Sequence, residues 1–434
     1  MVQPGLSLEQ APPLSVPFRF FLTAPAFGLA CAALLLWRGP EVFDSRWMPA
    51  ALGATHLVTL GLLASVMIGA MMQILPVLVG APLPAPRVVA GLTHVLLIGG
   101  TLALTGGFLW LQPALLGAAV VVLGAGFAIF VVAVIVSLVR VRAWNTTVGV
   151  MWLVAIALAA TVAFGALLAA SLGFGLALPT GALHDLHPGW GLLGWVGMLV
   201  IGVAYQVVPM FQMTPAYSDR LTSWLTWAIF ATLMLWSVVA VSLGEVGEAL
   251  AHGLALALAA AYATFALITL DLQRQRRRRL ADVTLDFWRV GMLCLIAAAA
   301  AWALRLTASV GFSDRFDVFL GILAIVGVAV SVVNGMLYKI APFLVWFHLQ
   351  AERSGRGTVP HMKKILGDAA QRTQFRVQLA ALALLLAAPW WTVLAYPGGI
   401  VLALSMVLLL RNLLAVLRVY REARVRAETA REAA

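Results

Sequence analysis

Four histidines lie near one end of the long apolar segments of this sequence. His56 begins one segment, His184 and His187 stand together in "HDLHPGW" before another, and His252 begins a third. Neutral imidazole is the commonest metal ligand in proteins and also the axial ligand of many haem irons. A metal or haem site is therefore one interpretation of these residues. The alternative for His184 and His187 is a place at the membrane interface, with His187 capping a helix that starts at Pro188.

His56 is the strongest single candidate because it lies deepest in apolar sequence. Arg305 lies near the same end of its own segment, where it could contact a haem propionate or simply extend its charge to the interface. Asn334 and Tyr338 lie inside another segment and either line a path or bond to neighbouring helices. The sequence has no nucleophile-and-base set, phosphate-binding loop or paired cysteine motif, which argues against a hydrolase or kinase of the soluble type.

The segments that carry these residues are long enough to cross a membrane. The chain has 434 residues, 63% hydrophobic and 10% charged, and its mean hydropathy is +1.00. Soluble proteins do not reach that balance, and about 20 apolar residues cross a bilayer. The sequence therefore predicts an all-α integral membrane protein, with residues 1–434 as one transmembrane domain. The polar breaks give twelve predicted spans: residues 17–37, 51–76, 88–108, 112–139, 147–173, 187–212, 222–243, 249–270, 287–308, 317–345, 374–394 and 398–419.

Positive charge gathers in alternate loops between these spans. The net charge is +11, and arginines follow the even-numbered spans, most densely within residues 274–279, whereas the other loops are short and mixed or acidic. Positive loops stay on the cytoplasmic side. We therefore expect a multi-pass protein of a bacterial-type inner (plasma) membrane, with both termini on the cytoplasmic side. Anionic lipid is enough to attract this charge, so no nucleic-acid partner is expected.

One stretch of sequence recurs three times, 133 residues apart. The copies are "GLLASVMIGAMMQILPV" from Gly61, "GWVGMLVIGVAYQVVPM" from Gly194 and "GVAVSVVNGMLYKIAPF" from Gly327, and two glycines and a proline align in all three. This predicts three four-helix units of one orientation, over roughly 17–139, 147–270 and 287–419, related by a pseudo-threefold axis. We expect the glycines to let helices approach closely, and the prolines to bend or end them.

Twelve helices in three units, with histidine at the outer ends of the second and sixth, resemble the catalytic subunit of haem–copper oxidases and nitric oxide reductases. The chain is more similar to the NnrS family, which contains haem and copper and is linked to nitric oxide stress. The first span begins "PFRFFL" at residues 17–22, as in that family, and "THLVTLG" places His56 five residues before Gly61. The resemblance covers the whole chain in architecture.

The resemblance implies haem b, and copper as a further metal, in a role in electron transfer or the nitric oxide response. Its implied haem contacts are His56, His184, His187 and Arg305. The metal ligands would come from His56, His184, His187 and His252.

The chain departs from these families at several ligand positions. Ala54 stands where NnrS proteins usually have the first of two histidines, and residues 317–346 and 221–243 contain no histidine. An oxygen-reducing or nitric-oxide-reducing centre is therefore not expected to be complete. Three alternatives stay open: haem held by His56 with a histidine of the sixth helix, metal without haem, or an empty scaffold.

Two other classes of function fit the sequence. A membrane transporter or metal permease would use the histidines as its outer entry site. A non-catalytic subunit of a respiratory complex would keep the scaffold and bind a redox or respiratory partner protein.

Overall fold

The computed structural model describes residues 10–178, 180–277, 282–308, 313–353 and 362–432. All regular elements in these ranges are helical, and eleven helices there are long and apolar enough to cross a membrane. The protein is therefore an all-α, multi-pass membrane protein, as its hydropathy predicts. Eight of the eleven are built on one α-helix each: α1 (Ser15–Arg38), α4 (Pro86–Leu109), α5 (Pro113–Val139), α6 (Thr146–Gly173), α9 (Asp219–Ser242), α10 (Glu248–Arg274), α11 (Val283–Thr307) and α16 (Ala395–Glu432).

The other three spans change helix type partway along. The first joins α2 (Pro49–His56), η3 (Leu57–Ala64), α3 (Ser65–Ile74) and η4 (Leu75–Val79). The second joins α7 (Leu183–Gly189), η5 (Trp190–Gly197) and α8 (Met198–Gln212). The third joins α12 (Asp314–Ile322), η7 (Leu323–Val330) and α13 (Ser331–Arg353). The remaining short elements are η2 (Gly39–Phe43), η6 (Gly244–Gly247), α14 (Met362–Ile365) and η8 (Thr392–Leu394).

The segments η3, η5 and η7 are π-helical, and each is eight residues long. Their first residues, Leu57, Trp190 and Leu323, are 133 positions apart, which is the offset of the sequence repeat. π-helical turns are rare in proteins and often mark functional sites. The repeat in the sequence is thus matched by a repeat in backbone geometry.

The repeated glycines pack against the long helix that precedes their own span. A Cβ atom on Gly61 or Gly69 would meet α1, and the equivalent atoms in the other two copies would meet α6 and α11. The side chains met are Phe27 and Phe20 on α1, Ala157 and Val150 on α6, and Cys294 and Phe287 on α11. In each pair the two partners are seven residues, or two helical turns, apart. The expected close approach at the glycines is confirmed in all three copies.

The repeated prolines were expected either to bend or to end their helices, and none of them is the last residue of its helix. Pro76, Pro209 and Pro342 all lie inside helical segments, which continue to Val79, Gln212 and Arg353 respectively. No proline of the three ends its helix.

The predicted span at 374–394 corresponds to α15 (Asp368–Ala387), which starts and ends earlier than expected. α15 is not among the eleven apolar spans, because its first half is polar and includes Arg372, Gln374 and Arg376. It nevertheless packs against α16 and also contacts α11 and α12.

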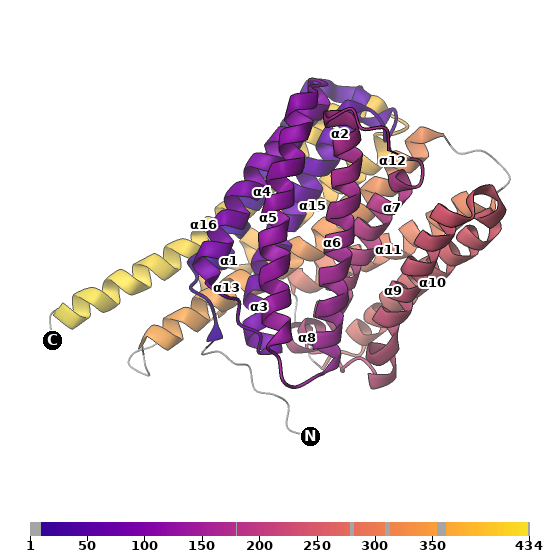
Figure 1. The fold of residues 1–434 in the computed structure, drawn as a ribbon. Helices are drawn as coiled ribbons and strands as arrows, with labels where there is room; N and C mark the ends of the chain where they lie inside the picture. The colour runs from indigo at the N-terminus through magenta and orange to yellow at the C-terminus, as the bar shows by residue number, and fades with distance from the viewer. Residues whose placement is uncertain (1–9, 179, 278–281, 309–312, 354–361, 433–434) are drawn as a thin grey trace.

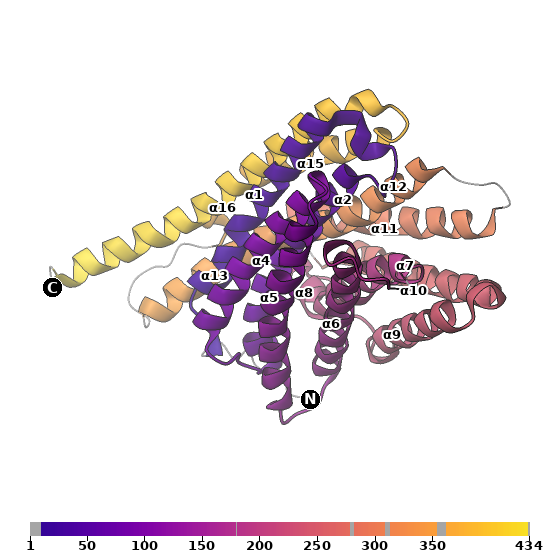
Figure 2. The same ribbon diagram turned by 45° about the horizontal axis from the view of Figure 1, so that its top comes forward.

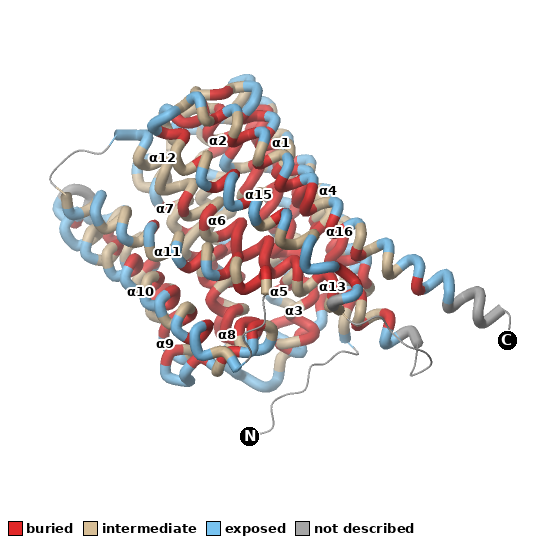
Figure 3. Tube along the Cα trace, turned by 180° about the vertical axis from the view of Figure 1, so that it is seen from behind, coloured by how far each residue is buried: buried red, intermediate tan, exposed pale blue. Residues whose placement is uncertain are grey.

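The helices are arranged so that the repeated spans lie in the interior. Among these spans, η7 contacts both η3 and η5. The first and last long helices, α1 and α16, pack side by side, while α9 and α10 form a pair at the opposite flank (Figures 1 and 2). Buried residues run through the middle of the bundle, whereas exposed residues alternate with buried ones along the α9–α10 pair and predominate near the end of α16 (Figure 3).

Candidate functional site

Two of the four predicted histidines come together between the first and second repeated spans. The ring centroids of His56 and His187 are 6.2 Å apart, and the ring planes differ by 13°. His56 is the last residue of α2, directly before η3, and His187 lies in α7, three residues before η5. Both rings are thus placed where an α-helix changes into a π-helix.

Each ring is fixed by a hydrogen bond from its Nδ1 atom to a backbone carbonyl. Nδ1 of His56 lies 2.8 Å from the carbonyl oxygen of Leu52, and Nδ1 of His187 lies 3.1 Å from that of Thr161 on α6. A carbonyl oxygen only accepts hydrogen bonds, so Nδ1 carries the proton in both rings. The neutral tautomer that results leaves the Nε2 lone pair of each histidine free. Most metal-binding histidines likewise donate the N–H of their other ring nitrogen to a carbonyl, a carboxylate or water.

Neighbouring groups enclose the pair. The ring of Phe108 on α4 lies 5.4 Å from that of His56. On the other side, a Cβ atom on Gly165 of α6 would lie 2.7 Å from Cε1 of His187. Any larger residue at position 165 would therefore displace the imidazole, so this glycine positions His187.

The other two histidines have different surroundings. His184 packs edge-on against Trp47, with centroids 5.0 Å apart. His252 lies on α10, and its Nε2 is 3.9 Å from a carboxylate oxygen of Glu248 on the same helix. Among the described residues, no three His, Cys, Asp or Glu side chains form a group that could hold a metal ion.

Arg305 takes part in a cluster of charges at the same end of the bundle. Its guanidinium donates to both carboxylate oxygens of Asp317, at 2.5 and 3.2 Å. Arg46 lies between Asp317, at 3.8 Å, and Asp185, at 3.3 Å. These four residues join the loop before α2 with α7, α11 and α12. Sequence reasoning identified Arg305 but did not pair it with Asp317, which is only 12 residues further along the chain. The contacts of Arg46 could not be expected from the sequence, because Asp185 is 139 residues away.

A chain of buried hydrogen bonds links α13, α15 and α16. The Asn412 amide donates to the hydroxyl of Tyr338 at 3.0 Å, and that hydroxyl donates to Gln374 Oε1 at 3.1 Å. The Gln374 amide then donates to Ser405 at 2.9 Å, and Ser405 donates to Gln378 Oε1 at 2.7 Å. All five residues are buried. Sequence reasoning noted only Tyr338, although the spacing of Gln374 and Gln378 on one helical face was a visible signal.

Two further polar residues within spans have structural partners. His94 on α4 hydrogen-bonds through Nε2 to the Thr23 hydroxyl of α1, at 2.8 Å. Lys339 on α13 forms an ion pair with Asp282, with an N–O distance of 2.8 Å. Asn334 is fully buried and neither atom of its amide has a hydrogen-bond partner. The His56–His187 pair is therefore the one place, among the candidates from the sequence, where two metal-binding side chains meet.

Comparison of the chain with models of known protein families finds no match, and comparison with curated proteins finds no similar sequence. The functional conclusion therefore depends on the geometry of the site itself.

Proposed function

We propose that this protein is a membrane metalloprotein in which His56 and His187 together hold a haem b iron or a copper ion. The observation that carries the proposal is the fixed His56–His187 pair. Imidazole suits both iron and copper. The two imidazole rings lie close together, with centroids 6.2 Å apart and planes that differ by 13°, and Nε2 of each ring would be available to a metal because Nδ1 is hydrogen-bonded.

The bound metal would supply one-electron chemistry, in electron transfer or in handling nitric oxide. The residues of this chain hold and orient it. The carbonyl groups of Leu52 and Thr161 keep both rings in the Nδ1–H tautomer, so Nε2 is available without loss of a proton. Phe108 and the helix surface at Gly165 limit the access of water to the rings. The missing histidines of residues 221–243 and 317–346 argue against a complete oxygen-reducing centre.

We also propose the finer architecture: twelve helices in three pseudo-threefold-related four-helix units, similar to the haem–copper oxidase scaffold and to the NnrS family. Three recurring features support it, namely the π-helical segments 133 residues apart, the glycine contacts in each copy and the contacts of η7 with η3 and η5. α15 would be the twelfth helix. The positive loops support an inner-membrane location with both termini in the cytoplasm.

Optical spectroscopy and metal analysis of the purified protein test the metal proposal. We expect a Soret band with one iron per chain, or stoichiometric copper without that band. His56→Ala and His187→Ala should each remove the signal, whereas the control His252→Ala, on the exposed face of α10, should keep it. A colourless, metal-free protein from cells supplied with haem precursor and copper would refute the proposal. A signal unchanged in both pair variants would also refute it.

A metal permease is the second candidate, and the buried hydrogen-bond chain from Asn412 to Gln378 favours it. Polar side chains at membrane depth are costly and commonly mark transport paths. In this case His56 and His187 form the outer site. Metal uptake into proteoliposomes should then fall in both His56→Ala and Gln378→Leu. Uptake that is unaffected by His56→Ala would exclude this candidate.

A further inference from the structure

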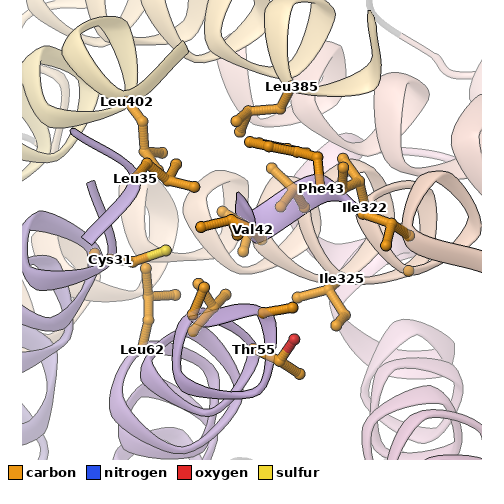
Figure 4. Close-up of a pocket in the computed structure, with 18 of the residues that line it drawn as sticks. Cys31, Leu35, Val42, Phe43, Thr55, Leu62, Ile322, Ile325, Leu385 and Leu402 are labelled. Atoms are coloured by element: carbon orange, nitrogen blue, oxygen red, sulfur yellow. The ribbon is translucent and has the colours of Figure 1, made fainter. Parts of the chain in front are cut away.

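A separate apolar cavity lies between the first and third repeated spans. Its volume is about 140 Å³. Its walls come from α1, α2 with η3, α12 with η7, α15 and α16, and Cys31, Leu62, Ile325, Leu385 and Leu402 point into it (Figure 4). Neither histidine of the pair lines the cavity, so it is distinct from the proposed metal site.

The polar side chains of the lining are confined to one end. Arg46 precedes α2, and Asp317 lies in the first turn of α12, so both belong to the outer ends of their spans. Their charges are already engaged, because Arg46 pairs with Asp185 and Asp317 pairs with Arg305. Thr55 adds one hydroxyl group at this level. The rest of the cavity therefore offers no unpaired charge to a ligand.

The cavity reaches deep into the bundle. Val330 lines it and lies 13 residues beyond Asp317 along one span, which corresponds to about 20 Å of helix at the α-helical rise. Met406, another lining residue, is fully buried next to Ser405 of α16. This inner part of the cavity offers water few polar partners, and an ordered water needs two or more.

We propose that this cavity binds small uncharged apolar molecules, in the size range from a diatomic gas to benzene. An apolar cavity of about 150 Å³ lined by aliphatic and aromatic side chains stays dry and takes up xenon or benzene. The cavity in this protein has a similar volume and a mainly aliphatic lining, although it is partly open and carries Arg46, Thr55 and Asp317 at one end. The proposal is independent of the metal site.

Gly321 provides a way to fill the cavity without disturbing its walls. It lines the cavity, and a Cβ atom built on it meets no other atom within 4 Å. A leucine side chain at position 321 therefore meets no steric obstacle, and because the residue lines the cavity we expect Gly321→Leu to reduce its free volume. Gly253→Leu is the matched control, because Gly253 is also helical, is exposed on α10 and likewise has no neighbour within 4 Å. Ala54→Leu fills the cavity from the opposite wall, should Gly321→Leu fail to fold.

Binding can be followed by NMR of methyl-labelled methionines in lipid nanodiscs, with benzene as the probe. Met406 reports the cavity, and Met234, 43% exposed on α9, reports benzene dissolved in the lipid. We expect a saturable shift of the Met406 signal and a non-saturable, linear shift at Met234. Gly321→Leu or Ala54→Leu should weaken the Met406 response at least ten-fold, and Gly253→Leu should leave it unchanged.

Three results would overturn the proposal. The Met406 signal could follow benzene linearly, as Met234 does. Its saturable shift could persist at full affinity in both filling variants. Lastly, Met406 could show contacts to acyl-chain protons and no response to benzene, which would identify a lipid tail as the occupant.

Discussion

Replacement of Gly61 by alanine should strain the contact between η3 and α1. A Cβ atom on Gly61 would lie 2.5 Å from Cβ of Phe27 and closer still to the Phe27 ring. Carbon atoms prefer separations of about 3.5–4.0 Å, so the two must move apart by about 1 Å. Rotation of the phenylalanine cannot provide this, because Cβ is fixed to the helix backbone. The helices themselves must therefore separate.

The size of the effect follows from this geometry. Extra atoms forced into a packed core cost about 1–3 kcal/mol, and backbone movement places Gly61→Ala near the upper end of that range. Phe27 is only 5% exposed, so its ring has no solvent-facing rotamer to adopt. We expect Gly61→Ala to lower the free energy of unfolding by about 2–3 kcal/mol. In a Phe27→Ala background the clashing ring is gone but Cβ of residue 27 remains, so Gly61→Ala should cost less there than in the unsubstituted chain without becoming neutral.

Reversible unfolding in sodium dodecyl sulfate, followed by circular dichroism, measures these differences. The four members of the Gly61–Phe27 cycle should show a coupling energy of at least about 1 kcal/mol, as expected for residues in direct contact. Gly253→Ala is the control, because its new methyl group meets no atom within 4 Å. If Gly61→Ala is as well tolerated as Gly253→Ala, the close packing of the repeated glycines is wrong.

Three more predictions concern polar contacts and can be measured by the same unfolding assay. Tyr338→Phe removes a hydroxyl that hydrogen-bonds to two partners, so it should lower the free energy of unfolding by about 1 kcal/mol. Tyr205 occupies the equivalent repeat position, and its hydroxyl has no hydrogen-bond partner. Tyr205→Phe should therefore lower the free energy of unfolding by less. Equal losses would contradict this. Thr284→Val deletes the 2.9 Å hydrogen bond from a buried hydroxyl to the carbonyl of Gly335. It should lower the free energy of unfolding by about 1 kcal/mol. An unchanged free energy of unfolding would show that this hydrogen bond contributes nothing to stability. Arg46→Gln should cost less than about 1 kcal/mol, because Arg46 is partly exposed, and the difference should shrink at high salt. A large, salt-independent loss would mean that the charge cluster is effectively buried.

The candidate site could be predicted only in part from the sequence. His56 and His187 were identified as polar groups at the ends of apolar segments, which is a local property of the chain. Their mutual contact was one of several open pairings, because equal depth in a membrane does not bring helices together. The carbonyl partners that fix their tautomers lie on α2 and α6, and no sequence pattern marks a backbone carbonyl as free.

The sequence by itself determined the class of the protein, the approximate spans and the 133-residue repeat. These properties depend only on residues that are close together in the sequence or repeat at a fixed spacing. Hydropathy, loop charge and the spacing of small residues can therefore be measured without knowing the fold. The tertiary structure decided which helix each repeated glycine touches, where the spans become π-helical, and which residues Arg46 pairs with. It also decided that His56 meets His187 while His184 and His252 lie elsewhere. Most of these features depend on contacts between residues on different helices, and the contacts of Arg46 with Asp185 and of His56 with His187 join residues more than 100 positions apart. Patterns in neighbouring sequence positions do not encode which helices meet.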